Sequence, residues 1–310
     1  MFQHWKERDL LKSRVSMILG GEGFDEYRRQ PFPAQVNPVR NSSRELDPAG
    51  IIVKSNPAAK QRSIISNGVN EKDLRIGGVK IIVHEVTGRL TPDQKELSEM
   101  VLQIHQLGFQ AVLHAVEEPT IEAACSAIES ALKASPRLDH RHRIEHCAVC
   151  FPPLAKRLAS LGIMVVTQPS FIYYHGERYL RTVPDSNLRH LYPIATLMKN
   201  GVKVVGSSDC PVSPVNPLIG IYSSVSRMAE SGEFILPEEK ISPFEALRMY
   251  TDEAAKTTFE ETIKGSITPG KLADLVILNG DPTRLPVNEI KDIEVEMTIL
   301  NGEVVWDRMR

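Results

Sequence analysis

Residues 108–146 read GFQAVLHAVEEPTIEAACSAIESALKASPRLDHRHRIEH, and this stretch alternates short apolar runs with a longer helical pattern. The runs at 110–114 and 143–146 are typical of buried strands. Between them, about residues 121–133 carry apolar side chains at helical spacing, namely Ile121, Ala124, Cys125, Ile128 and Leu132. A strand, a helix and another strand in this order predict a parallel sheet with helices outside it.

The same alternation extends to both sides of this unit. Further strands are predicted at 78–83, 163–168 and 202–206, with helices near 154–161 and 194–199. After the strand at 78–83, Thr91 is the expected N-cap of a helix whose apolar face is formed by Leu97, Val101, Ile104 and Leu107. Ser242 and Glu245 form a capping box that opens further helices, through about residue 259.

The two ends of the chain differ from this repeating part. Strands are predicted at 275–278, 294–300 and 303–306, and Asn301-Gly302 between the last two is a strong hairpin signal. Residues 15–19 could form a strand, whereas 36–70 are a polar insert expected to be mostly loop or disorder. We therefore predict a main domain over 1–260 and C-terminal strands over 261–310.

Composition excludes several classes of protein. The 310 residues carry 37 basic and 39 acidic side chains, a net charge of −2, so a strongly basic nucleic-acid surface is not expected. No apolar run is long enough for a membrane span, and the N-terminus lacks the apolar core of a signal peptide. Four cysteines are too few for a disulfide framework and favour a reducing, cytoplasmic setting.

Ionisable residues stand at the ends of several predicted strands. His114 and His146 end two of them, Asp209 follows a third, and Lys80 lies inside the strand at 78–83. In a β/α barrel, functional groups collect where parallel strands end. Two imidazoles and a carboxylate suit a divalent metal such as zinc, which would activate water. Each residue alone also has a structural interpretation: a core histidine, a turn aspartate or an outward-reaching lysine.

Other polar residues are assigned less specific roles. His140 and His142 are expected on the surface, and His84 and His105 have no assigned partner. Cys147 and Cys150 form a CxxC pair, interpreted as structural because no second pair or thioredoxin-like context accompanies it. Two candidate substrate-binding residues lie in the segment after the strand at 163–168, namely Tyr174 and Arg178.

Four motifs together resemble the amidohydrolase superfamily, and most closely its amidohydrolase-3, or YtcJ-like, branch. They are RIEH at 143–146, GSSDCPV at 206–212, YT at 250–251 and KGSITPGKLAD at 264–274. The resemblance covers about residues 76–306. It implies a TIM-like (β/α)8 barrel with a small β-sandwich, and hydrolysis of amide-type C–N bonds in small-molecule substrates. It also implies one or two divalent metal ions, zinc first, with manganese or iron as alternatives.

The resemblance also assigns roles to individual residues. Lys80 matches a strand-four lysine that is carboxylated in many members and bridges two metals. His114 matches the strand-five ligand and His146 the strand-six ligand. Asp209 matches a strand-eight aspartate that serves as both metal ligand and general base.

This sequence departs from the family at its N-terminal end. No His-x-His precedes Lys80, although the family uses that motif for two ligands of the first metal. The expected fold is therefore an α/β barrel lacking its first two strands, with a partial C-terminal β-sandwich. The alternative to an active enzyme is an incomplete fragment or remnant. Such a chain would form a homo-oligomer or need a complementing N-terminal fragment.

Overall fold

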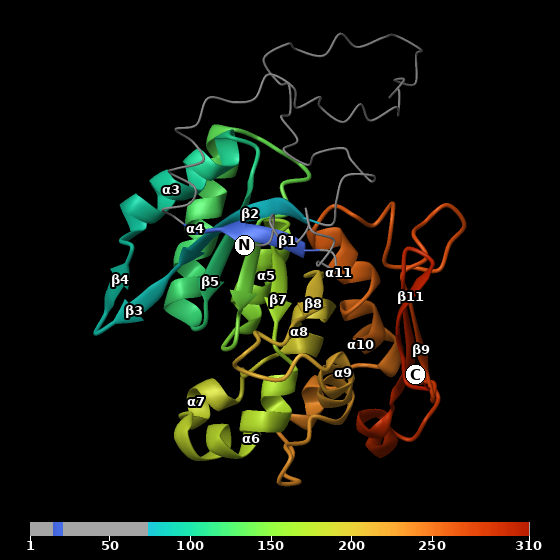
Figure 1. Ribbon diagram of the computed structural model, residues 1–310. Helices are drawn as coiled ribbons and strands as arrows, with labels where there is room; N and C mark the ends of the chain where they lie inside the picture. The colour runs from blue at the N-terminus through green and yellow to red at the C-terminus, as the bar shows by residue number, and fades with distance from the viewer. Residues whose placement is uncertain (1–14, 21–73, 310) are drawn as a thin grey trace, which may run out of the picture.

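The structure, a computed structural model, describes residues 15–20 and 74–309. Its main feature is a six-stranded sheet of order β1-β2-β5-β6-β7-β8, in which every pair of neighbours is parallel (Figure 1). The strands are β1 (Val15–Leu19), β2 (Leu74–Ile82), β5 (Gln110–Ala115), β6 (Arg143–His146), β7 (Met164–Thr167) and β8 (Val204–Gly206). This confirms the predicted α/β class with a parallel sheet.

The ends of this sheet are β1 and β8. The possible strand at 15–19 does form, and it pairs in parallel with β2 although the two are far apart in sequence. In the part of the chain that the structure describes, β1 and β8 stand at opposite ends of the strand order. The predicted polar insert at 36–70 lies outside the described residues.

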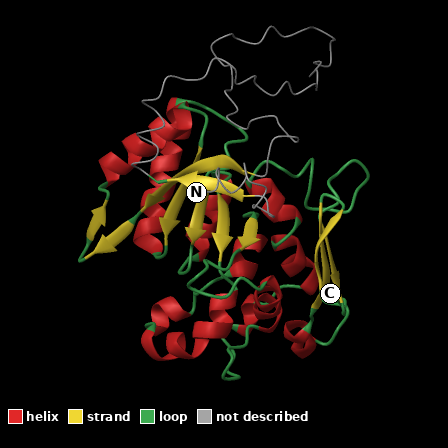
Figure 2. Ribbon diagram, in the orientation of Figure 1, coloured by secondary structure: helices red, strands yellow, loops and turns green. Residues whose placement is uncertain are grey.

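Helices connect the strands and cover the sheet (Figure 2). They are α3 (Gln94–Gln106), α4 (Glu118–Ala134), α5 (Pro152–Ser160), α6 (Ser170–Thr182), α7 (Asp185–Leu188), α8 (Ile194–Lys199), α9 (Pro217–Ser226), α10 (Pro243–Met249) and α11 (Asp252–Thr257), with 3-10 turns at Pro237–Glu239 and Val287–Asp292. In Figure 1, α6 and α7 lie beyond the arrowheads of the strands. They therefore lie on the side where the strand-end residues emerge.

The two faces of the sheet carry different side chains. Val79 and Ile81 of β2 and Leu113 of β5 belong to one buried cluster with helix residues such as Leu97 and Ile121. Successive residues of a strand point to opposite faces. The sequence neighbours of the strand residues in this cluster, among them Lys80, His114 and Glu145, therefore lie on the other face of the sheet. The large apolar core thus lies between the sheet and these helices, and these polar side chains lie on the other face of the sheet.

One helix start differs from its prediction. The N-cap of α3 is Asp93, whose side chain accepts a hydrogen bond from the Glu96 amide at 2.9 Å. The expected N-cap, Thr91, instead ends β4 (Arg89–Thr91), which pairs with β3 (His84–Val86) in a short hairpin. The prediction was wrong because the hairpin uses Thr91 as a strand residue. The capping box of Ser242 and Glu245 is confirmed at the start of α10.

The C-terminal strands form a separate three-stranded antiparallel sheet of order β11-β10-β9. Its members are β9 (Leu275–Leu278), β10 (Val295–Leu300) and β11 (Glu303–Asp307). Asn301 and Gly302 connect the last two, with φ values of 53° and 86°. Positive φ at both turn residues is what a two-residue hairpin requires, so the prediction from Asn-Gly is confirmed.

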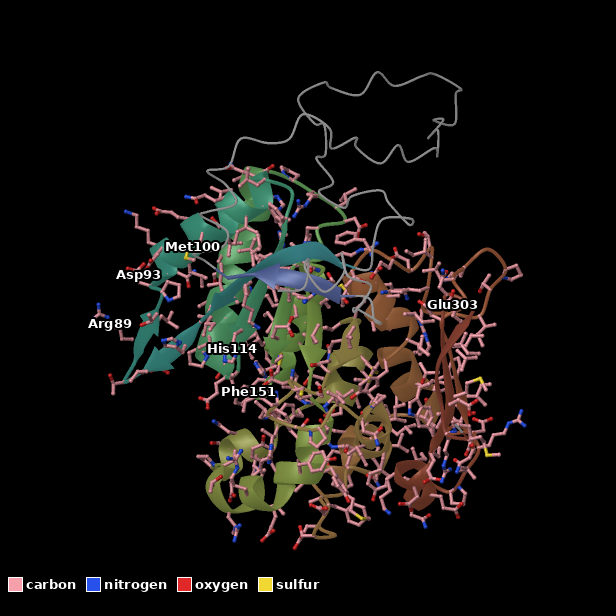
Figure 3. All side chains as sticks on the ribbon, in the orientation of Figure 1. Arg89, Asp93, Met100, His114, Phe151 and Glu303 are labelled. Carbon is pink, nitrogen blue, oxygen red and sulfur yellow. The ribbon has the colours of Figure 1, made fainter. Side chains whose placement is uncertain are left out.

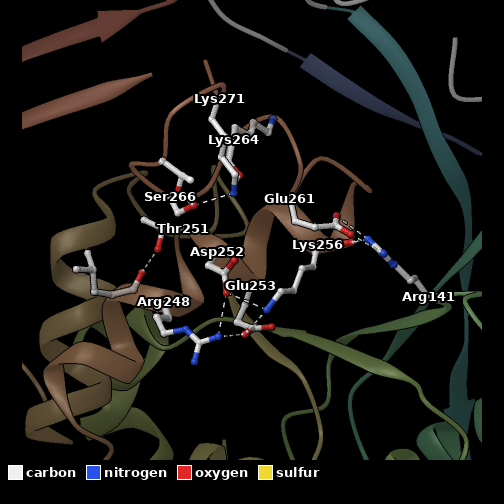
Figure 4. Close-up of polar contacts among 12 residues, drawn as sticks. Arg141, Arg248, Thr251, Asp252, Glu253, Lys256, Glu261, Lys264, Ser266 and Lys271 are labelled. Carbon is white, nitrogen blue, oxygen red and sulfur yellow. Dashed lines mark hydrogen bonds and ion pairs between the residues drawn. The ribbon is translucent and has the colours of Figure 1, made fainter. Parts of the chain in front are cut away.

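An ion-pair network joins the segment before these strands to the main sheet (Figure 4). Arg141, just before β6, lies 2.7 Å from Glu261 and donates to the Lys256 carbonyl at 2.6 Å. Lys256 and Arg248 both pair with Asp252, at 2.8 and 2.9 Å. Because these side chains are partly buried, the network fixes α10 and α11 against the loop that precedes β6.

In the described residues, no helix has the length and apolar character needed to cross a membrane.

Candidate active site

Two histidines meet at neighbouring strand ends. His114 is on β5 and His146 ends β6, and the centroids of their rings are 4.3 Å apart with an edge-on angle of 71°. Figure 3 shows His114 at the end of β5 that points toward α6 and α7. The expectation that parallel strands deliver these two imidazoles to one place is therefore met by the geometry.

The His146 ring is held from a second direction. Its Nδ1 lies 2.8 Å from Oε1 of Gln168, the residue that follows β7. Both side chains are buried, and the His146 backbone has a left-handed φ of 77°. Sequence reasoning missed Gln168, although its position at the end of a predicted strand was a usable signal.

Burial keeps both imidazoles neutral near neutral pH. Burial first, then the charges of His146 and Lys80, lower the pKa of His114 to about 4. Burial also lowers the pKa of His146, and the Asp209 carboxylate opposes that effect. A neutral imidazole has a free nitrogen lone pair, which is the form that binds metal.

Lys80 and Asp209 lie in the same electrostatic neighbourhood. Burial lowers the pKa of Lys80, while the carboxylates of Glu145 and Asp209 oppose the shift. Asp209 follows β8 with a left-handed φ of 54°. Its carboxylate opposes the effect of burial on the pKa of both Lys80 and His146. The four predicted site residues thus share one region of the molecule.

The structure brings two of the predicted metal ligands together, as the imidazoles of His114 and His146. The two neutral imidazoles are suitable nitrogen donors. Among residues 15–20 and 74–309, however, no three His, Cys, Asp or Glu side chains converge as they stand on a point that could hold a metal. The described residues therefore bring together two candidate nitrogen ligands, with the charged side chains of Lys80 and Asp209 near them.

An ion pair lies next to Lys80 on the same face of the sheet. Arg143 Nε lies 2.7 Å from Glu145 Oε1, and Arg143 Nη1 donates to Gln110 Oε1 at 2.9 Å. Both charged side chains are largely buried. The charge of the Glu145 carboxylate acts on the Lys80 amine, an interaction that sequence reasoning did not assign.

The two predicted substrate-binding residues occupy different surroundings. Arg178 is exposed on α6, 5.4 Å from the Tyr179 ring, and its charge acts on the buried Tyr192 hydroxyl. Burial, Tyr179 and Asp209 raise the pKa of Tyr192, so this hydroxyl is also close to the site. Tyr174 instead lies against Tyr173, and the charge of Glu230 acts on it.

The prediction of a surface position for His140 and His142 is wrong. Both are buried, at 4% and 0% exposure, and His142 contacts His105 with 2.8 Å between ring nitrogens. The segment before β6 packs both imidazoles into the interior, which a polar stretch of sequence does not reveal. Cys147 and Cys150 are buried free thiols, so the structural interpretation of the CxxC pair remains the simplest.

The fold and this site define a class of protein: an α/β protein with histidines gathered at the carboxyl edge of a parallel sheet. A sequence profile of the amidohydrolase family matches residues 29–306. The chain belongs to this family, and the predicted resemblance is confirmed.

Individual relatives agree with this assignment. The chain is 27% identical to the amidohydrolase-type protein YtcJ of Bacillus subtilis over 219 residues, 70% of this chain and 41% of that protein. It is 28% identical over 217 residues to an N-substituted formamide deformylase of Arthrobacter pascens, 69% of this chain and 40% of that protein. The chain thus spans about two fifths of the length of these curated relatives.

Solved structures show the same fold. An uncharacterised metal-dependent hydrolase from Pyrococcus furiosus matches with a TM-score of 0.67 at 21% identity. The match covers 91% of this chain and 54% of that one. A second such hydrolase, from Pyrococcus horikoshii, matches with a TM-score of 0.60 at 21% identity, over 70% and 47% of the two chains.

Proposed function

We propose that this chain is a metal-dependent hydrolase of amide-type C–N bonds, built on six strands of a barrel that has eight in the family pattern. The observation that carries the proposal is the pair of neutral imidazoles, His114 and His146, at adjacent strand ends, with the Asp209 carboxylate acting on His146. Membership of the amidohydrolase family supports it.

In this proposal His114 and His146 supply nitrogen ligands. A divalent ion, zinc first and manganese or iron as alternatives, supplies when bound a Lewis acid that acidifies water and polarises the amide carbonyl. Asp209 accepts the proton of the attacking water and returns it to the leaving nitrogen, the work of a general base and then a general acid. One or two ions fit the proposal.

Lys80 is proposed as a carboxylated ligand. Its amine nitrogen would bond to the carbon of CO2, giving a carbamate and releasing one proton. The unprotonated amine is the reactive form, and burial lowers the pKa of Lys80. Carboxylation would also remove a cation from a largely enclosed position and provide oxygen ligands.

The substrate is proposed to be a small amide. The similarity to an N-substituted formamide deformylase makes N-substituted formamides the first compounds to test. Arg178, beside Tyr179 and Tyr192, is a candidate contact for a polar substituent, and Tyr174, four residues earlier in α6, is a second candidate. A cytoplasmic setting is proposed from the sparse cysteines, all four of which are free thiols.

Metal analysis tests this proposal directly. Purified protein, dialysed with zinc, should contain near-stoichiometric metal, and a His114→Ala, His146→Ala double variant should lose most of it. His190→Ala is the matched control, because its ring packs against Phe151 instead of joining the pair. Equal metal content in the double variant and the wild type, with the fold verified by circular dichroism, would contradict the proposal.

A further inference from the structure

Gln168 is a buried residue whose side chain the proposed chemistry does not yet use. It is 1% exposed, it directly follows β7, and its Oε1 lies 2.8 Å from His146 Nδ1. We propose that Gln168 is a positioning residue that holds His146 as the Nδ1–H tautomer and leaves Nε2 as the ligand nitrogen. The inference rests on the proposed function for its consequence, but its structural part can be tested without metal.

The hydrogen bonds of Gln168 determine which way its amide points. Its Nε2 donates to the carbonyl oxygen of Val166 at 3.4 Å, so Oε1 is the atom that faces His146. The reversed amide would place two oxygens together at Val166 and lose that bond. Since a carbonyl oxygen can only accept, His146 Nδ1 must carry the hydrogen.

The tautomer then follows for His146. A neutral imidazole has a single N–H, and burial at 8% exposure favours the neutral ring. With the hydrogen on Nδ1, the lone pair is on Nε2. Metal-binding histidines commonly donate their other ring N–H to an oxygen in this way, which fixes both tautomer and ring direction.

Two contacts from different strands also fix the direction of the His146 ring. The edge-on contact with His114 comes from β5, and the hydrogen bond to Gln168 comes from the end of β7. The backbone at His146 is left-handed, and the next amide, of Cys147, donates to the Ala115 carbonyl at 3.0 Å. The His146 ring is therefore held by contacts from two neighbouring strands, at a position where the backbone bends sharply.

The experiment compares Gln168→Leu, which removes the acceptor at similar size, with Gln168→Glu, which keeps an acceptor. In metal-free protein at pH 8, ¹⁵N ring shifts of labelled histidine report the tautomer, and the His146 signals are assigned by their absence from a His146→Gln variant. The wild type and Gln168→Glu should show His146 as Nδ1–H. Gln168→Leu should show a mixture or Nε2–H.

Zinc affinity is the second measurement, by competition with a chelating dye. Gln168→Leu should bind zinc about 10- to 100-fold more weakly, the usual effect of losing such a support, and Gln168→Glu should restore most of the affinity. Gln106→Leu, at an exposed position near the end of α3, is the control and should change neither measurement.

The two proposals fail in different ways. An Nε2–H tautomer in the metal-free wild type, or an unchanged tautomer in folded Gln168→Leu, would overturn the role of Gln168. If wild-type protein takes up no zinc, manganese or iron, the proposed function fails, and the tautomer spectra alone then decide about Gln168. If Gln168→Leu does not fold, the comparison of the wild type with Gln168→Glu still reports the tautomer.

Discussion

His105 Nδ1 lies 2.8 Å from His142 Nε2 in a buried contact between α3 and the segment that precedes β6. His142 Nδ1 accepts the amide hydrogen of Ala111 at 2.9 Å, so in the neutral ring Nε2 carries the hydrogen and donates to His105. His105 in turn donates from Nε2 to the Ser135 carbonyl at 2.6 Å. Each of these three hydrogen bonds has one donor and one acceptor when both imidazole rings are neutral.

His140 extends this chain. Its Nδ1 accepts from the His142 amide and its Nε2 donates to the Leu161 carbonyl, both at 2.9 Å. Burial is the first cause that lowers the pKa of His105, His140 and His142, and the cation of Arg137 lowers all three further.

Acid is therefore expected to destabilise the fold through these histidines. Their pKa values are lower in the folded than in the unfolded state, so below the ordinary value of 6.5 the unfolded chain binds more protons. The free energy of unfolding should then fall as pH drops from 7 toward 5. The loss should be up to about 2 kcal/mol for each histidine that stays neutral.

Urea unfolding at pH 7 and pH 5 measures this effect. His142→Gln should show a smaller loss between the two pH values than the wild type, although it is less stable at pH 7. His84→Gln, at an exposed position on β3, should behave as the wild type. Equal losses in all three proteins would show that the buried histidines do not cause the acid sensitivity.

Arg227 should be essential for stability. This fully buried side chain donates from Nε, Nη1 and Nη2 to the carbonyls of Ile235, Tyr192 and Leu191, at 2.9, 2.9 and 3.1 Å. Burial lowers its pKa to about 10, so it remains a cation at neutral pH. Arg227→Met removes these three buried hydrogen bonds, and among the described residues only the Tyr192 carbonyl keeps a second donor, the Ile194 amide. The substitution should cost about 3 kcal/mol or more of unfolding free energy.

Chemical denaturation at pH 7.5 provides the measurement for Arg227. The matched control is Arg178→Met, since Arg178 is exposed and should change stability by less than about 0.5 kcal/mol. Similar small losses in both variants would show that the three carbonyls find other partners.

A methyl group at Gly220 should clash with Tyr250. A Cβ built there would lie 1.8 Å from Tyr250 Oη and 2.7 Å from Cζ. Gly220→Ala gains about 1 kcal/mol of helix propensity in α9, but the clash should outweigh it and lower the melting temperature. Tyr250→Phe removes the closest atom, so a Gly220→Ala, Tyr250→Phe double variant should regain part of the melting temperature that Gly220→Ala loses.

Gly20→Ala is the control for that pair, because no atom of the described part of the chain lies within 4 Å of its Cβ position. The measurement is the melting temperature of four variants: Gly220→Ala, Tyr250→Phe, the double variant of the two, and Gly20→Ala. A Gly220→Ala protein as stable as the Gly20→Ala protein would mean that Tyr250 moves aside without cost.

Asp209→Asn should abolish most of the proposed activity. Asparagine keeps the shape and tolerates the left-handed backbone at this position, but it lacks the basicity of a carboxylate. If the chain hydrolyses N-substituted formamides or simple amides, kcat should fall about 10²- to 10⁴-fold. Metal content should fall less than in the double histidine variant. Undiminished turnover would remove Asp209 from the mechanism.

The sequence by itself determined the local elements. Short strand-like runs between helical patterns located β6 at 143–146 and β9 at 275–278, and Asn301-Gly302 specified its hairpin through backbone preferences of those two residues. The positions of His114 and His146 at strand ends were also predictable, because parallel strands bring their carboxyl ends to one edge.

Only the tertiary structure decided which side chains meet. Three contacts join segments that are separate in the sequence: the hydrogen bond from His146 to Gln168, the interaction of Glu145 with Lys80, and the buried contact of His142 with His105. A single sequence carries no signal for such pairs, because the partners are set by strand order and by the direction in which each side chain leaves the sheet. The same holds for Arg227, whose buried charge is stabilised by three carbonyls that converge on it and by the carboxylates of Glu238 and Glu239.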